Sequence, residues 1–184
     1  APHAHRLVLA GAGSGKTRVL VHRIAWLMSE QEINPYSFLA VTFTNKAAHE
    51  MRSRIEALHG FPLGGIWVGT FHGLSHRLLR THSNAANLPE GFQILDSDDQ
   101  LRLVKRVQKS LEIDTEKFAP KQAQWFINKC KEEGRRPNNV TTGDYFSDTM
   151  QRIYAAYATI CQRSGLVDFS ELLLRSLELL KQNQ

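Results

Sequence analysis

The chain has 184 residues, of which 42% are hydrophobic, and a formal net charge of +5. This length can bury one or two cores without disulfides or structural metal, which excludes a small disulfide-rich scaffold, and the positive charge is compatible with a polyanionic partner. Cys130 and Cys161 form no metal-ligand pattern and favour free thiols in the cytoplasm, and no apolar run approaches the roughly 20 residues that span a membrane.

Short apolar segments alternate with helical patterns in the first half of the chain. This alternation predicts an α/β unit with parallel strands joined by helices. The predicted strands are RLVLA at 6–10, FLAVTF at 38–43, IWVGTF at 66–71 and FQILD at 92–96. The apolar faces of the first two helices are expected to be Leu20, Ile24 and Leu27, and then Ala48, Met51, Ile55 and Leu58.

Beyond residue 97 the strand signal disappears, and four helices are predicted. The first is expected to open with a capping box from Ser97 to Gln100, and the second to run from Pro120 towards Gly134. The third should end at Gly165 with Met150, Ile153, Tyr154, Tyr157 and Ile160 along one face, and the last should follow a capping box from Asp168 to Glu171. These signals predict an α/β domain over 1–97 and an all-helical domain over 98–184.

A glycine-rich turn lies between the first predicted strand and the first helix. Its sequence, AGAGSGKT, fits the phosphate-binding pattern G-x-x-x-x-G-K-[ST] with Ala10 in place of the first glycine. Backbone N–H groups would surround phosphate oxygens, Lys16 would neutralise the β/γ charge, and the Thr17 hydroxyl would bind Mg²⁺. The candidate nucleotide-binding residues here are Ala10, Gly11, Ala12, Gly13, Ser14, Gly15, Lys16 and Thr17; a turn without a ligand is the alternative.

Hydrolysis of a nucleotide needs a carboxylate at the end of another strand. Asp96 and Asp168 both follow apolar segments and compete for that role. Each also stands at the beginning of a predicted helix, where capping explains it without catalysis. We therefore expect capping to be the main role of both aspartates.

Two further strand ends resemble each other. After the strand 38–43, Phe43 could stack on a base while Thr44 and Asn45 hold a phosphate; alternatively, Phe43 fills the core and Thr44 caps the helix. The strand 66–71 likewise leads into Thr70, Phe71 and His72. From there, His72, His76 and Arg80 form a basic helix stripe that suits a phosphate track, whereas a zinc pair at His72 and His76 lacks a third ligand.

With these motifs in this order, the chain resembles the UvrD/Rep family of superfamily 1A DNA helicases. LAGAGSGKT is similar to motif I, VTFTNKAAHEM to motif Ia and GTFHGLSHRLLR to motif Ib, while FQILDSDDQLRL and GLVDFSELLLR resemble the helical subdomain 1B. The resemblance implies that residues 1–97 are part of a RecA-like P-loop NTPase domain 1A, a parallel sheet flanked by helices. Residues 98–184 would be the inserted, all-helical subdomain 1B.

The resemblance also implies roles for individual residues. ATP and Mg²⁺ would be the cofactors, with Lys16 and Thr17 as the catalytic residues and Arg18 beside the adenine. Single-stranded DNA would be contacted by Phe43, Thr44, Asn45, Phe71, His72 and Arg77.

The implied parent protein is an ATP-dependent 3′-to-5′ DNA helicase of DNA repair, with single-stranded DNA, single-strand/duplex junctions and repair proteins as partners. The family's glutamine motif and its acidic motif II are not in these residues, and the chain does not begin with Met. We therefore expect an N-terminal fragment that binds nucleotide and DNA weakly, does not hydrolyse ATP and self-associates through an open sheet edge. The alternatives are a subunit of a helicase-nuclease complex, a nucleotide kinase or GTPase, and a nucleic-acid-binding module with an idle P-loop.

Overall fold

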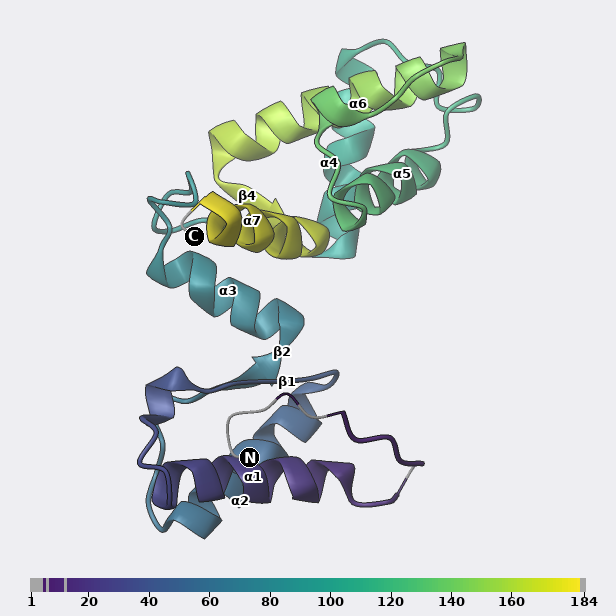
Figure 1. Ribbon diagram of the computed structural model, residues 1–184. Helices are drawn as coiled ribbons and strands as arrows, with labels where there is room; N and C mark the ends of the chain where they lie inside the picture. Colours follow the sequence, from purple (N-terminus) through teal and green to yellow (C-terminus); the bar gives the residue numbers. More distant parts are fainter. Residues whose placement is uncertain (1–4, 6, 12, 183–184) are drawn as a thin grey trace. The chain divides into compact units, whose positions relative to one another are not determined.

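The computed structural model describes residue 5, residues 7–11 and residues 13–182. Its ribbon is mixed α/β and mostly helical, with small parallel sheets (Figure 1). Contacts within the chain form two compact units, Ala1–Leu74 and Ser75–Gln184, and the division falls inside helix α3 (Phe71–Thr81). The domains predicted from the sequence, 1–97 and 98–184, remain a prediction.

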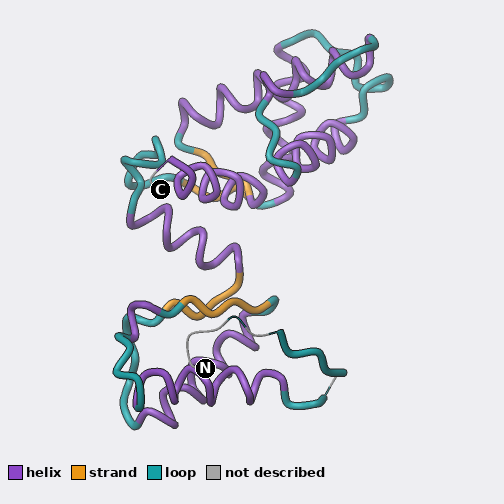
Figure 2. The backbone as a smooth tube through the Cα atoms, viewed as in Figure 1, coloured by secondary structure: helices purple, strands orange, loops and turns teal. Residues whose placement is uncertain are grey.

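The first unit carries a two-stranded parallel sheet. Strand β1 (Leu39–Thr42) pairs with strand β2 (Trp67–Thr70), so that Leu39 lies opposite Trp67 and Thr42 opposite Thr70. Figure 2 shows the two strands side by side in orange. Helix α1 (Lys16–Ser29) and the 3₁₀ turn η1 (Pro35–Ser37) precede them, and helix α2 (Asn45–His59) connects them. The strands predicted at 38–43 and 66–71 are confirmed.

Helices α1 and α2 pack on one face of this sheet (Figure 1). The shared core contains Val21, Ile24 and Met28 of α1, Met51 and Ile55 of α2, and Ala40 and Val68 of the strands. The predicted face of α2 is right for Ala48, Met51 and Ile55, whereas Leu58 is exposed. The predicted face of α1 is right for Ile24 but wrong for Leu20, which is exposed, and Leu27 is only partly buried; the other buried residues of α1 are Val21, Ala25 and Met28.

The strand predicted at 6–10 is not formed. Arg6 lies outside the described residues, and residues 7–10 have no regular secondary structure, with Leu7 and Leu9 each 83% exposed. A strand needs a neighbour for its backbone hydrogen bonds. Within the described part of the chain, β1 and β2 pair only with each other, so this apolar segment has no ladder partner.

The second unit contains the other parallel pair. Strand β3 (Gln93–Leu95) pairs with strand β4 (Leu166–Asp168), with Ile94 opposite Val167. The segment at 92–96 is therefore a strand as predicted, but it does not extend the sheet of the first unit. The all-helical prediction for 98–184 is wrong at β4, because three residues between two helices are too short to give a period of their own.

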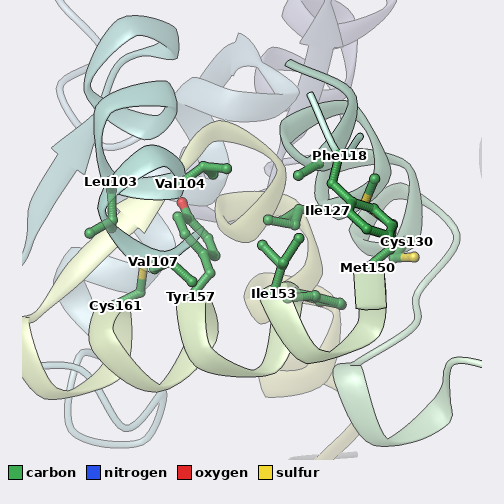
Figure 3. Close-up of a cluster of buried hydrophobic side chains, with 12 residues drawn as sticks. Leu103, Val104, Val107, Phe118, Ile127, Cys130, Met150, Ile153, Tyr157 and Cys161 are labelled. Atoms are coloured by element: carbon green, nitrogen blue, oxygen red, sulfur yellow. The ribbon is translucent and has the colours of Figure 1, made fainter. Parts of the chain in front are cut away.

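Helices make up most of this unit. They are α4 (Ser97–Ser110), α5 (Pro120–Glu132), α6 (Tyr145–Ser164) and α7 (Phe169–Gln182), with a 3₁₀ turn, η2 (Pro137–Asn139). Figure 3 shows Met150, Ile153 and Tyr157 along α6, facing side chains of α4 and α5. The buried face predicted for α6 is confirmed at those positions and at Tyr154, whereas Ile160 is only partly buried.

The helix ends follow local chemistry. Pro120 is the first residue of α5 as predicted, and α6 ends at Gly165, whose φ of 62° is left-handed. The capping box predicted from Ser97 is wrong by one residue, because Asp96 is the N-cap and its carboxylate accepts from the Asp99 N–H at 2.7 Å. The Asp168 carboxylate accepts from the Glu171 N–H at 2.8 Å, as a helix cap does.

Both cysteines are buried free thiols, as expected from their spacing. Burial is the main reason why the pKa of Cys161 rises to about 11. None of the helices in the described residues combines the length and the apolar character that crossing a lipid bilayer requires.

Candidate functional site

The glycine-rich turn has a backbone conformation that favours glycine. Gly13 and Gly15 have φ values of 74° and 83°, a region that L side chains rarely adopt. No atom lies within 4 Å of the point where a Cβ would stand on Gly11, Gly13 or Gly15. The turn is held by Ser14, whose hydroxyl donates to the Gly11 carbonyl at 2.7 Å. Ala12 lies outside the described residues.

Lys16 folds back over this turn. Its ammonium donates to the carbonyl oxygens of Ala10 and Gly11, at 2.7 Å and 2.5 Å. Charge-assisted hydrogen bonds of this kind are strong, and they place the charge at the mouth of the turn. A phosphate oxygen that replaced either carbonyl would pair with the same cation.

Helix α1 begins at Lys16 with an uncapped N-terminus. The N-cap residue Gly15 offers no side-chain acceptor, and the backbone ladder begins with the Val19 N–H donating to the Gly15 carbonyl at 3.1 Å. Orphan N–H groups and the helix dipole together favour an anion at such an end. Thr17 and Arg18 lie in this first turn and are exposed. The turn and the helix end therefore present donors suited to phosphate.

The carboxyl ends of β1 and β2 form a second candidate region. Thr42 and Thr70 are paired across the two strands, and Phe43 and Phe71 come directly after them. Adjacent strands are about 4.8 Å apart, so both aromatic residues leave the same edge of the sheet from neighbouring positions. Phe43 is 94% exposed and Phe71 is 59% exposed. The alternative in which Phe43 fills the core is wrong.

Threonine hydroxyls organise both junctions. Thr44 Oγ1 accepts from the Ala47 N–H at 3.1 Å, and Thr70 Oγ1 accepts from the Gly73 N–H at 3.1 Å. The first contact confirms the capping role that the sequence allowed for Thr44. Asn45 is the exposed first residue of α2, and His72 is exposed in the first turn of α3. Two helix starts thus carry two exposed aromatic rings.

The basic stripe predicted on α3 is only partly available. Arg80 lies over the Phe92 ring at 3.9 Å and donates to the Glu90 carbonyl and to His76 Nε2, each at 2.9 Å. Burial is the main reason why the pKa of His76 is lowered, and the positive charge of Arg80 is the second. Arg77 is half-buried in the second unit. Both side chains therefore have partners within the chain, and the phosphate track through His76 and Arg80 stays a prediction.

The zinc alternative finds no support among the described residues. They contain no group of three or more His, Cys, Asp or Glu side chains placed to hold a metal ion. His76 Nε2 accepts the Arg80 hydrogen bond, which occupies one of the two ring nitrogens that a metal could use.

Sequence reasoning missed a buried charge cluster around Lys131. Its ammonium contacts Asp168 at 2.6 Å and Glu171 at 2.9 Å, and all three side chains are almost fully buried. Arg136 and Arg175 also pair with Glu171. The sequence did contain one signal that Lys131 is buried. Lys131 stands four residues after Ile127 and eight after Ala123, on the buried stripe of α5. The capping role predicted for Asp168 is real but accounts for only one of its oxygens.

Asp168 is held by several donors. Tyr157 donates its hydroxyl to Asp168 Oδ2 at 2.7 Å, and the Gln100 amide donates to the same oxygen at 3.3 Å. An aspartate with these partners is fixed inside the second unit, and Asp96 is fixed as the cap of α4. Both positions support structural roles over hydrolysis for these two carboxylates.

Comparison with known proteins places these features in a family context. The model of the UvrD/REP helicase N-terminal domain matches residues 1–184. DNA helicase II of Escherichia coli (strain K12) is 61% identical over 180 residues, covering 97% of this chain, and DNA helicase II of Haemophilus influenzae is 55% identical over 187 residues. The ATP-dependent DNA helicase PcrA of Staphylococcus aureus (strain Mu50) is 39% identical over 175 residues, covering 94% of this chain. The chain spans about a quarter of the length of these relatives.

Proposed function

The chain belongs to the UvrD/REP helicase N-terminal domain family, and we propose that it is part of an ATP-dependent 3′-to-5′ DNA helicase that acts in DNA repair. One observation carries the proposal beyond family membership. The register pair Thr42 and Thr70 sets two exposed phenylalanines at one sheet edge, in the same compact unit as the glycine-rich turn. This combination suits a unit that binds a nucleotide and a single strand together.

In the proposed nucleotide site, the described residues fit ATP with Mg²⁺. The open glycine backbone, the uncapped end of α1 and the Lys16 ammonium are all donors for phosphate oxygens. Lys16 would hold the β- and γ-phosphates, Thr17 would bind the Mg²⁺ ion, and Arg18 would lie beside the adenine. Bound ATP supplies the free energy of phosphoanhydride hydrolysis. The remaining candidates, Ala10 to Gly15, would surround the phosphates.

We predict that Lys16→Ala weakens binding of a Mg-ATP analogue about tenfold or more, because a charged hydrogen-bond donor is lost. Titration of a fluorescent analogue measures the effect, with Lys46→Ala as a control, since Lys46 is an exposed lysine of the same unit. Equal affinity for the parent chain and Lys16→Ala would favour the alternative of a nucleic-acid-binding module with an idle loop.

Hydrolysis of ATP also requires an acidic residue that positions the attacking water. The 184 residues contain no Asp-Glu pair that could serve as the family's acidic motif, and Asp96 and Asp168 are occupied as caps. We therefore propose that the chain by itself binds ATP without turning it over. Phosphate release at the rate of an intact helicase would contradict this.

In the proposed DNA site, Phe43 and Phe71 stack on successive bases. Thr44, Asn45 and His72 lie beside them at the two helix starts, where N–H groups favour phosphate. Arg77 is the weakest of the predicted DNA contacts, because it is half-buried. Single-stranded DNA and single-strand/duplex junctions are the proposed ligands.

We predict that Phe43→Ala and Phe71→Ala each weaken binding of a labelled oligodeoxythymidylate about tenfold, because stacking contributes about 1 to 3 kcal/mol per base. Fluorescence anisotropy measures the affinity. Phe61→Ala is the matched control, since Phe61 is a comparably exposed phenylalanine of the same unit outside the strand ends. An equal loss in all three variants would show a non-specific apolar effect and remove the support for the site.

The domain assignment is also a proposal: residues 1–97 as part of the RecA-like domain 1A, and 98–184 as subdomain 1B. The helicase subunit of a helicase-nuclease complex is the alternative parent protein. Self-association is proposed because β1 and β2 have unpaired outer edges in the described part of the chain. Sedimentation at rising concentration tests it. We also propose that the parent protein has DNA-repair proteins as partners and is located in the cytoplasm.

A further inference from the structure

Helix α5 presents an exposed tryptophan between two lysines. Trp125 is 61% exposed, and the Lys129 ammonium lies 4.9 Å from the centre of its ring. Lys121 stands four residues before Trp125 on the same helix face and is exposed as well. We call Lys121, Trp125 and Lys129 the α5 surface. The two lysines are about 12 Å apart along the helix axis, with the ring midway between them.

On α5 itself, the residues around the ring are not acidic. The residues one turn from Trp125 on its own helix are Lys121, Gln122, Asn128 and Lys129, and none of them is acidic. Neither lysine of the α5 surface forms an ion pair with any residue that the structure describes. The next carboxylate along α5 is Glu132, at the last residue of the helix. The neighbours of the ring on its own helix are therefore basic and polar, while Gln124 donates to the Ser97 carbonyl at 2.7 Å and so joins α5 to the acidic first turn of α4.

A second pair of the same kind adjoins the beginning of α5. Tyr145 is 67% exposed, and the Lys117 ammonium lies 5.3 Å from its ring centre. Tyr145 contacts Phe118 edge-on at 5.8 Å, and Phe118 precedes the first residue of α5 by two positions. An exposed ring with a lysine thus occurs twice in this part of the second unit.

We propose that the α5 surface binds single-stranded nucleic acid, with a base on Trp125 and backbone phosphates at Lys121 and Lys129. A single strand repeats one flat base and one phosphate per nucleotide, which matches a ring between two cations. A protein partner would instead favour apolar neighbours around the tryptophan, because binding hot spots lie in dry, well-packed pockets. None of these residues belongs to the strand-end site, so the inference does not depend on the proposed function.

The test uses the whole chain with Phe43→Ala and Phe71→Ala as background, which removes the strand-end contacts. Adding Trp125→Ala should weaken binding of labelled oligodeoxythymidylate about tenfold. Adding Lys121→Ala and Lys129→Ala together should lower the slope of log Kd against log salt by about 1.4, because each lost phosphate contact removes about 0.7 for a single strand. Both changes are at exposed positions, and circular dichroism checks that the variants fold.

Lys105→Ala with Lys109→Ala is the control for charge, since these two lysines of α4 are exposed and the double substitution removes the same net charge. The proposal is supported if only the α5 variants lose affinity and salt slope. It is overturned if Trp125→Ala leaves oligonucleotide binding unchanged, which would assign the ring to a protein partner, or if the α4 pair changes the slope equally, which would mean that net charge alone acts. Neither result bears on the strand-end site, because that site is tested without the α5 changes.

Discussion

In the Lys131 cluster, the pKa values of single residues are set by a balance between burial and neighbouring charges. Burial alone would raise the pKa of Glu171, but Lys131, Arg136 and Arg175 outweigh it and lower that pKa to about 2. Burial would likewise lower the pKa of Lys131, yet the two carboxylates raise it above its ordinary value. Lys131 and Glu171 therefore both stay charged at neutral pH, and their ion pair joins α5 to α7.

The lowered pKa of Glu171 predicts acid sensitivity. The unfolded chain takes up this proton near pH 4.5, whereas the folded chain takes it up only near pH 2, so protonation favours unfolding. The stabilisation is present above pH 4.5 and is lost as the pH falls towards 2, by about 3 kcal/mol at 1.36 kcal/mol per pKa unit. Urea unfolding at pH 7, 4.5, 3 and 2 measures the loss.

Glu171→Gln should flatten this pH dependence, since the group that titrates is removed. Glu116→Gln is the control, because Glu116 is exposed. If both variants keep the acid sensitivity of the parent chain, Glu171 does not cause it.

At the scale of whole elements, local signals fix where helices begin and end better than they fix which face is buried. Pro120, Gly165 and the carboxylate of Asp168 mark ends that the structure confirms. On α1 the prediction holds for Ile24, but Val21 and Met28 are buried where Leu20 and Leu27 were expected, because apolar residues stand side by side on that helix and only the core chooses between them. Helix ends are local chemistry, whereas a buried face depends on what packs against it.

The C-terminus of α6 gives a prediction of this kind. Gly165 has a left-handed backbone, and a Cβ there would lie 2.6 Å from Pro89 Cγ. Gly165→Ala should destabilise the second unit by more than the roughly 1 to 2 kcal/mol expected for the backbone conformation alone. Thermal unfolding measures it.

Gly134→Ala isolates the backbone part of that cost. Gly134 has a φ of 75°, but no atom lies within 4 Å of its Cβ position. Equal destabilisation by the two substitutions would mean that the Pro89 contact relaxes without cost.

At the scale of the whole molecule, each compact unit has its own core. Ile55 is fully buried among α1, α2 and the β1–β2 sheet, and Ile153 is fully buried among α4, α5 and α6. Because the cores are separate, we expect the two units to unfold in separate events, although helix α3 contains the boundary between them.

We predict that Ile55→Ala and Ile153→Ala each cost about 2 to 5 kcal/mol, and only in their own unit. Amide hydrogen exchange followed peptide by peptide separates the two: Ile55→Ala should raise exchange in residues before Leu74, and Ile153→Ala in residues after Ser75. Loss of protection throughout the chain from either change would show one cooperative domain.

The sequence by itself determined the family, the order of helices and most strands, the helix ends and the phosphate-binding pattern, because each of these is written in contiguous residues. Tertiary structure decided the rest. It placed Phe43 in solvent and not in the core, and it paired the segment at 92–96 with β4 across more than 70 residues of chain. It also brought Lys131 to Asp168 and Glu171, and it set Arg80 against His76 and the Phe92 ring. Strand pairing and buried charge partners join residues far apart in the chain, so no local pattern contains them.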